Sequence, residues 1–294
     1  MTNKLKQHLS IADQVSLLES RGLLIEDREA AEAFLERVNY YRFSGYLHDF
    51  KINKSDNYRA GVSFNHIARI YEFDTKFTRL LLYVLEDIEE TLKTRFSYTL
   101  SSTYPEKPLI YLDSSIYRSK ESFNTFKRLF EMSKNNNSGL PFIKHHINKY
   151  GGNLPIWVAV EIMTMGNVHS LYDNLIRRLQ KNIAKKYHTG SMQLANWIEN
   201  LTYTRNHLAH YMRIYNYSFG RIPMACNNHP MNAIYKGKIF DQIAIMSFMY
   251  SDPKEWNSYV LPEIEKLLNA YSDVINLDGL GFSEKWNDDL MVPE

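Results

Sequence analysis

The amino-acid sequence predicts an all-α protein. Its 294 residues include only 12 glycines and 9 prolines, which favours long helices over the many turns of a sandwich or barrel. No segment of useful length alternates apolar and polar residues in the manner of a half-buried strand. Residues 63–103 contain neither Gly nor Pro, and their apolar side chains recur at the helical period. They are expected to form one very long helix, or two helices joined by a kink.

Residues 1–62 are expected to form an N-terminal helical extension. Ser10 opens a near capping box before a short helix, and Gly22 ends that helix. A second helix is expected over residues 28–50, because its apolar residues keep a three-to-four spacing. Its aromatic end, residues 39–46 (NYYRFSGY), is expected to pack against neighbouring helices, and the alternative is stacking on unpaired bases.

Residues 63–222 are expected to form the helical core. Gly166 and Asn167 are expected to separate a buried segment from a helix that contains residues 171–186. That helix carries a basic ridge at i, i+4 and i+8 spacing, and no acidic residue lies at positions 174–198. Such a ridge attracts phosphate, and the equally weighted alternative is a solvated helix face. The ridge consists of Arg177, Lys181 and Lys185.

Residues 223–294 are expected to form a C-terminal helical extension packed on the core, with helices at 240–250 and from 253 to about 267. The lone Cys226 excludes an internal disulfide and suits a reducing cytosol. Without a signal-like N-terminus or an apolar run of membrane-spanning length, the chain is expected to be soluble and cytoplasmic, with no membrane partner. The formal net charge of +2 means that nucleic-acid binding requires a local basic patch.

The stretch that organises the chain is residues 197–216 (WIENLTYTRNHLAHYMRIYN). As a single helix, it would place Asn206, His210 and Arg213 on one face, with Arg205 one step round. This face combines a permanent cation, a base that titrates near neutral pH and an amide. The alternative is again a solvated helix face.

Several enzyme classes are excluded, because the sequence lacks a phosphate-binding GxxxxGK[ST] loop, a GxGxxG turn, a GxSxG elbow and an HExxH metal helix. His207 and His210 stand three residues apart, but no acidic residue lies within one turn of either, so neither a metal site nor another cofactor is expected. The acidic residues at 86–90 are interpreted mainly as surface salt-bridge partners. The alternative is a carboxylate that orients a catalytic histidine.

Arg205 and His210 suit the cleavage of RNA through its own 2′-hydroxyl. This reaction needs a base for the 2′-OH proton, an acid for the departing 5′-oxygen and a cation for the charge of the phosphorane. A histidine can act as base or acid, and no metal is required. Because one histidine per chain is scarcely enough for two proton transfers, we expect a homodimer that brings two copies of the motif together.

Several segments together resemble a known family. They are residues 21–27 (RGLLIED), 39–46 (NYYRFSGY), 70–74 (IYEFD), 154–161 (LPIWVAVE), 205–210 (RNHLAH) with Arg213 and Asn216, and 279–286 (GLGFSEKW). Residues 205–210 fit the R-x4-H signature of HEPN ribonucleases, helical proteins whose composite active sites form by dimerisation. The wider pattern, which covers almost the whole chain, resembles the Abi family of bacterial abortive-infection, phage-resistance proteins of the AbiD and AbiF type.

The chain departs from the family pattern, which reads RNxCAHHxRxxN, at two positions. Leu208 stands where Cys is usual, and this change affects packing more than chemistry. Tyr211 stands where a second His is usual, which weakens any scheme in which adjacent histidines share the acid and base roles.

The resemblance implies a HEPN-like helical bundle and a metal-independent endoribonuclease that acts as a toxin or phage-defence effector. Arg205 would stabilise the phosphorane, His210 would transfer protons, and Asn206 would hold His210 or the scissile phosphate. The residues expected to bind the RNA backbone are Arg213, Asn216, Arg177, Lys181 and Lys185. The alternatives are a non-catalytic RNA-binding protein that holds a structured, regulatory small RNA, and a helical scaffold that binds only proteins.

Overall fold

The all-α prediction is confirmed. The computed structural model describes residues 7–225 and 237–293, and within these ranges the regular structure is helical, with only isolated bridges between extended residues. The longer helices are α1 (Ile11–Ser20), α2 (Arg28–Arg37), α3 (Tyr40–Leu47), α4 (Phe64–Thr103), α5 (Lys120–Asn136), α6 (Pro141–Tyr150), α8 (Met165–Asn174), α9 (Arg177–Ala184), α10 (Ser191–Ala209), α11 (Ile239–Met249) and α13 (Leu261–Ala270). The short helices are α7 (Ile156–Ala159), α12 (Pro253–Glu255), α14 (Leu277–Leu280) and α15 (Trp286–Leu290). The HEPN-like bundle and the division into three domains stay predictions.

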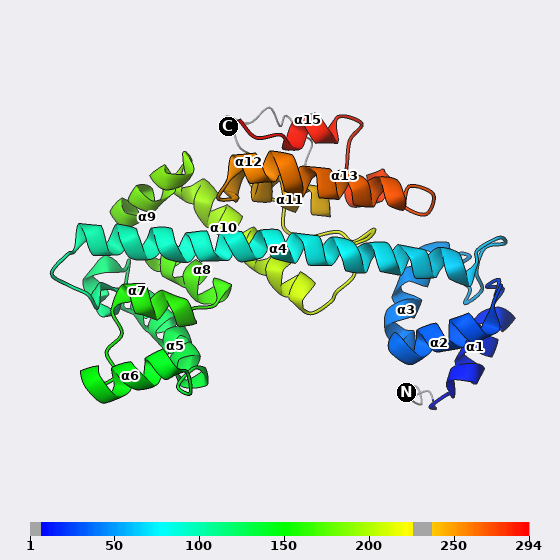
Figure 1. The fold of residues 1–294 in the computed structure, drawn as a ribbon, viewed down its shortest axis with the longest axis horizontal. Helices are drawn as coiled ribbons and strands as arrows, with labels where there is room; N and C mark the ends of the chain where they lie inside the picture. The colour runs from blue at the N-terminus through cyan, green and yellow to red at the C-terminus, as the bar shows by residue number, and fades with distance from the viewer. Residues whose placement is uncertain (1–6, 226–236, 294) are drawn as a thin grey trace.

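Helix α4 is the long central helix against which the other helices are arranged (Figure 1). It runs unbroken over 40 residues, about 60 Å, so the expectation of one very long helix is confirmed. The Ser63 hydroxyl caps its first turn by accepting a hydrogen bond from the His66 backbone N–H at 3.2 Å. A stripe of its side chains is fully buried: Ile67, Ile70, Phe77, Leu81, Val84, Ile88 and Leu92. Helices α1–α3 lie at its N-terminal end, α5–α9 gather near its C-terminal end, and α11–α13 lie along another side (Figure 1).

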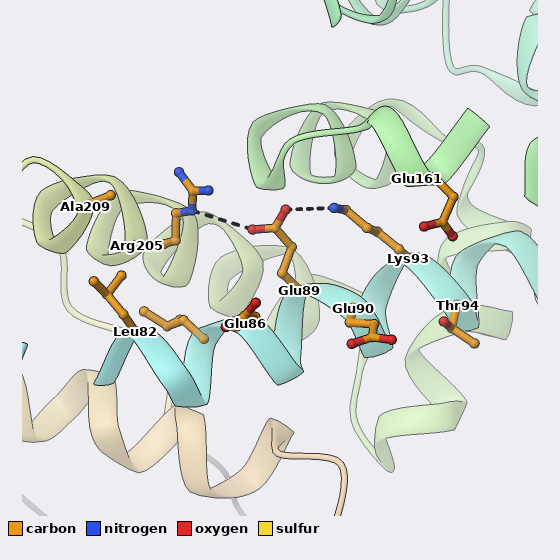
Figure 2. A pocket seen from close by; sticks show the side chains of 10 residues that line it. Leu82, Glu86, Glu89, Glu90, Lys93, Thr94, Glu161, Arg205 and Ala209 are labelled. Atoms are coloured by element: carbon orange, nitrogen blue, oxygen red, sulfur yellow. Dashed lines mark ion pairs between the residues drawn. The ribbon is translucent and has the colours of Figure 1, made fainter. Parts of the chain in front are cut away.

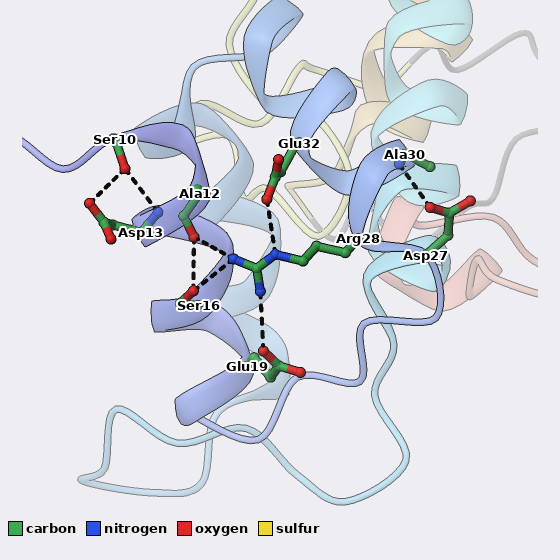
Figure 3. A network of polar contacts seen from close by, with 9 residues as sticks. All are labelled: Ser10, Ala12, Asp13, Ser16, Glu19, Asp27, Arg28, Ala30 and Glu32. Carbon is green, nitrogen blue, oxygen red and sulfur yellow. Dashed lines mark hydrogen bonds and ion pairs between the residues drawn. The ribbon is translucent and has the colours of Figure 1, made fainter.

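Arg28 joins α2 to α1 (Figure 3). Its guanidinium donates to the Ala12 carbonyl at 2.9 Å and to the Ser16 hydroxyl at 2.8 Å, both on α1. It also donates to Glu32 on its own helix at 3.0 Å. Because one guanidinium binds groups on both helices, these contacts fix how the two short helices pack.

The expected helix over residues 28–50 is wrong, because the chain breaks into α2 and α3. Val38 is extended, and the Asn39 side chain starts α3 by accepting a hydrogen bond from the Tyr41 backbone N–H at 2.8 Å. The break turns α3 onto α4 and buries Phe43 completely. Tyr41, in contrast, is 86% exposed. The packing interpretation of the aromatic segment therefore holds for only part of it.

The expected helix over residues 171–186 is also wrong. Helix α8 begins at Met165, just before the expected separator, and runs through it, because Thr164 and Asn167 form a reciprocal capping box. The chain then becomes extended, where the Ile176 N–H donates to the Ile116 carbonyl at 2.9 Å, and α9 starts afresh. Backbone pairing with a distant segment overrides the local helical preference.

The C-terminal part contains the expected helices. Helix α11 agrees with the prediction for residues 240–250, and the second helical run extends from α12 through a π-helical segment (Trp256–Val260) to α13. The fully buried Trp256 donates from its indole N–H to the Leu290 carbonyl at 2.8 Å. This hydrogen bond attaches α15, near the C-terminus, to the second helical run. None of the described helices combines the length and apolar character needed to cross a bilayer. Cys226 lies outside the described residues.

Two neighbouring aromatic residues on α4 test how much its buried face contributes to stability. Phe96 is fully buried and stacks on Tyr172 at 5.5 Å between ring centroids, whereas Tyr98 is 66% exposed. We expect Phe96→Ala to lower the free energy of unfolding by about 3–5 kcal/mol because it leaves a cavity. Tyr98→Ala should change it by less than about 0.5 kcal/mol. Chemical denaturation measures both, and equal effects would contradict this account.

Candidate functional site

Helix α10 carries the central motif and ends inside it. Its last residue is Ala209, so the expectation of one helix over residues 197–216 is wrong. Tyr211 adopts a left-handed backbone conformation with a φ of 55°. The two backbone hydrogen bonds of a Schellman motif close around it and end the helix. The chain therefore turns away directly after His210.

A buried carboxyl group fixes the segment that follows this turn. Asp74 on α4 accepts hydrogen bonds from the backbone N–H groups of Tyr215 at 2.8 Å and Ile214 at 3.1 Å. It also accepts one from the Tyr46 hydroxyl of α3 at 2.6 Å. Asp74 is only 2% exposed, and this burial raises its pKa to about 6. Three parts of the chain that are far apart in sequence thus meet at one carboxyl group.

Arg213 and Asn216 bind a second carboxylate instead of sharing a face with Asn206. The Asp49 carboxylate lies 3.2 Å from the Arg213 guanidinium and accepts a hydrogen bond from the Asn216 amide at 3.1 Å. The Asn216 side chain also fills the space that a Cβ at Gly279 would occupy, so a larger residue at Gly279 would displace Asn216. The predicted common helical face is therefore wrong, while the predicted RNA contacts of these two residues stay a prediction.

Arg205 lies at the edge of a groove between α4 and α10 (Figure 2), with a volume of about 470 Å³. Glu89 on α4 sits between two cations, with one carboxylate oxygen 3.5 Å from Nε of Arg205 and the other 2.9 Å from Nζ of Lys93. The two terminal nitrogens of Arg205 point away from Glu89 (Figure 2). The interpretation of the acidic cluster as salt-bridge partners therefore holds for Glu89, and one of its partners is the motif arginine itself. Further carboxylates of the groove are Glu86, Glu90 and Glu161.

The two histidines of the motif have different surroundings. His210 and Asn206 are exposed at the end of α10. His207 is buried beside the Tyr217 ring, and its Nε2 donates to the Arg213 carbonyl at 2.9 Å. Burial lowers the pKa of His207, which keeps it neutral and structural. In the part of the chain that the structure describes, no group of three or more His, Cys, Asp or Glu side chains is arranged to hold a metal ion.

The basic ridge lies at the other end of α10 from the motif. Arg177 and Lys181 are exposed on α9, and Lys185 is exposed in the 3-10 turn that follows. Within the described residues, none of the three forms an ion pair with a carboxylate. Helix α9 packs against α10, and the 14 to 19 residues that separate the start of α10 from the motif correspond to about 20–30 Å. An RNA that contacts both the ridge and the motif must therefore be several nucleotides long.

The sequence contained a signal for Asp74 that its apolar surroundings obscured. Asp74 stands at helical spacing between the buried Ile70 and Phe77, which is a position on the buried stripe of α4. A carboxyl group on such a stripe requires several hydrogen-bond donors. The partners themselves, Tyr46 and the backbone after α10, could not be derived from spacing because they come from other elements.

Comparison with protein-family models identifies a family. A family model described as Abi-like protein matches residues 33–216, which is more than half of the chain. The match runs from within α2 to Asn216, and so includes Asp74, Glu89 and the motif. The comparison with curated proteins and the comparison with solved structures found no match.

Asp74→Asn tests the buried carboxyl group. An amide nitrogen accepts no hydrogen bond, so the Ile214 or Tyr215 N–H loses its partner, and we expect the free energy of unfolding at pH 5 to fall by about 1–3 kcal/mol. Because the folded-state pKa is raised from 3.8 to about 6, the folded protein binds more protons than the unfolded chain between these values. This contribution to stability is present at low pH and is lost as the pH rises through 6.

Denaturation of both proteins between pH 4 and pH 7 measures this contribution. The wild type should lose stability over this window relative to Asp74→Asn, which lacks the titrating group. Glu72→Gln, an exposed carboxylate on the same helix, serves as the control and should keep the wild-type profile. Parallel profiles for wild type and Asp74→Asn would contradict the assignment.

Proposed function

Because the chain belongs to the Abi-like protein family, we propose that it is an abortive-infection, phage-defence effector that acts as a metal-independent endoribonuclease. The observation that carries this proposal is the exposed end of α10. There, within little more than one helical turn, the chain presents a guanidinium, an amide and an imidazole, from Arg205, Asn206 and His210. These groups match the cation and the proton carrier that cleavage of RNA through its 2′-hydroxyl needs.

Arg205 is the proposed electrostatic group. Its Nε faces Glu89, while its terminal nitrogens point away from that carboxylate (Figure 2). One terminal nitrogen of Arg205 also donates to the Asn206 side-chain oxygen, at a long 3.5 Å. The remaining terminal N–H groups stay available for contact with phosphate. Glu89 therefore positions Arg205. The ion pair between Glu89 and Lys93 in turn fixes the Glu89 carboxylate.

His210 is the proposed proton carrier, and two chains are proposed to share one site. Its exposed position leaves the imidazole accessible to a 2′-hydroxyl. The reaction needs an acid and a base, and of the two motif histidines only His210 is exposed, because His207 is buried. The groove beside Arg205 also holds four carboxylates against two cations, so a second Arg205 from a partner chain would offset the repulsion of phosphate.

The α9 ridge is the proposed contact for the RNA backbone. It is exposed and carries no ion pair with the described carboxylates, so its charges remain for phosphate. Direct RNA contacts of Arg213 and Asn216 would require both side chains to leave Asp49. In the described conformation they hold the turn after His210, which is a positioning role.

His210→Ala tests the chemistry. We expect the purified protein to cleave single-stranded RNA in the presence of EDTA and to leave 2′,3′-cyclic phosphate ends. His210→Ala should lower the rate by about 100-fold or more, because general acid–base catalysis contributes about 10²–10⁴-fold. His145→Ala removes an exposed histidine on α6 and should leave the rate unchanged.

Arg205→Ala should cause a comparable loss, with Arg128→Ala on α5 as its matched control. Full cleavage by both motif variants would contradict the assignment. Binding of RNA without any product from the wild type would instead support the non-catalytic RNA-binding alternative.

Lys181→Gln combined with Lys185→Gln tests the ridge. We expect weaker RNA binding and a salt dependence whose logarithmic slope falls by roughly one for each phosphate group that the ridge no longer binds. Lys144→Gln with Lys149→Gln, two exposed lysines on α6, removes the same charge from another surface and should leave the slope unchanged. Titrations at several salt concentrations measure both, and equal slopes for the two double variants would contradict the ridge assignment.

A further inference from the structure

A cavity of about 150 Å³ lies between α3, α4 and the turn that ends α10. We call it the Tyr211 pocket. Its inner wall includes the buried Tyr46 and Asp74, and two arginines, Arg42 and Arg79, line it together with Tyr211. An engineered cavity of about 150 Å³ holds a benzene ring, so this volume corresponds to one small aromatic ring. The combination of an aromatic rim, flanking cations and a single-ring volume distinguishes this pocket from the acidic groove.

Tyr211 is held on the rim of the pocket by a costly backbone conformation. A left-handed conformation costs a residue with a Cβ roughly 1–2 kcal/mol, and glycine or asparagine is usual at this position of a Schellman motif. Arg42 stabilises it, because its guanidinium donates to the Tyr211 carbonyl at 2.8 Å and lies 5.7 Å from the centre of the Tyr211 ring. The side chain is nevertheless 65% exposed. A large ring is thus fixed in place but left largely uncovered.

The pocket adjoins the motif. Tyr211 directly follows His210 in the chain, and Leu82 on α4 lines both the Tyr211 pocket and the groove that contains Arg205. A strand whose phosphate lies at Arg205 and His210 therefore places a neighbouring nucleotide at the pocket. Arg79 is exposed there and forms no side-chain hydrogen bond or ion pair with the other described residues, so its guanidinium is free for a phosphate.

We propose that the Tyr211 pocket binds one unpaired nucleobase of an RNA strand, stacked on Tyr211, beside the phosphate at Arg205 and His210. This inference rests on the proposed RNA-cleaving function and names its substrate class, single-stranded RNA with an unstacked base. Unpaired bases bind proteins by stacking on aromatic rings and guanidinium planes, whereas bases inside a duplex are not accessible for such stacking. The pocket therefore selects loops and single strands over duplex RNA.

The test measures binding separately from cleavage, in a His210→Ala protein. The probe is a short oligouridylate, whose bases have a single ring, with one fluorescent pyrimidine analogue whose emission reports stacking. Tyr211→Gly removes the ring and also relieves the left-handed strain, so the melting temperature should not fall. We expect it to weaken binding by roughly 5- to 150-fold, the range measured for loss of one base–aromatic stack, and to abolish the fluorescence change. Tyr211→Phe keeps the ring and should retain both.

Tyr150→Ala is the matched control, because Tyr150 is also exposed and also has a cation, Lys149, over its ring at 5.2 Å. Equal affinities of the Tyr211→Gly and Tyr150→Ala proteins for the probe would overturn the inference. A further comparison uses the same probe annealed to oligoadenylate, and this duplex should bind more weakly than the single strand. Tight binding of the duplex that Tyr211→Gly does not change would also overturn it.

The two proposals fail in different ways. If the wild type binds the probe through Tyr211 but cleaves no RNA, the pocket stands and the nuclease proposal falls. If the wild type cleaves RNA and Tyr211→Gly changes neither the affinity nor the cleavage of single strands, the nuclease proposal stands and the pocket falls.

Discussion

The hydrogen bonds that Asp74 accepts inside the core are the interaction on which the motif's position depends. They join α4 to the hydroxyl of Tyr46 on α3 and to the backbone of Ile214 and Tyr215 after α10. A buried carboxyl group without such donors would be strongly destabilising, so the three segments are stable only in this arrangement. The turn that contains His210 and Tyr211 lies between α10 and the residues that bind Asp74. The path of this turn is therefore fixed at both ends.

The same arrangement connects the N-terminal and C-terminal parts of the chain to the motif. Asp49, after α3, binds Arg213 and Asn216. Gly279, near the C-terminus, leaves room for the Asn216 side chain, and the Tyr215 hydroxyl accepts a hydrogen bond from the Asn276 backbone N–H at 3.1 Å. Segments near both ends of the chain thus support the candidate site, and substitutions in them are expected to act on the motif through its turn.

The sequence predicted the helical class and the long α4, because an uninterrupted apolar stripe without Gly or Pro determines both. It did not predict three helix ends, at Val38, after α8 and at Ala209. The helix ends after α8 because the backbone there pairs with Ile116. The helix end at Ala209 requires a left-handed backbone conformation at Tyr211, which sequence rules assign to glycine or asparagine. For the site, the pattern singled out Arg205, Asn206 and His210, whose catalytic roles stay a prediction. The partners Glu89, Asp49 and Asp74 come from distant elements, which spacing along one helix cannot reveal.

We propose that two chains contribute His210 to one catalytic site. A mixing experiment tests this shared site most directly. Wild-type and His210→Ala chains are unfolded together at varied ratios, refolded, and assayed for cleavage of single-stranded RNA. If each site needs both histidines, activity falls with the square of the wild-type fraction, to about one quarter at an equal mixture, because about one quarter of randomly paired dimers then hold two wild-type chains. A linear fall, to about one half, would show that each chain acts alone and would contradict the claim.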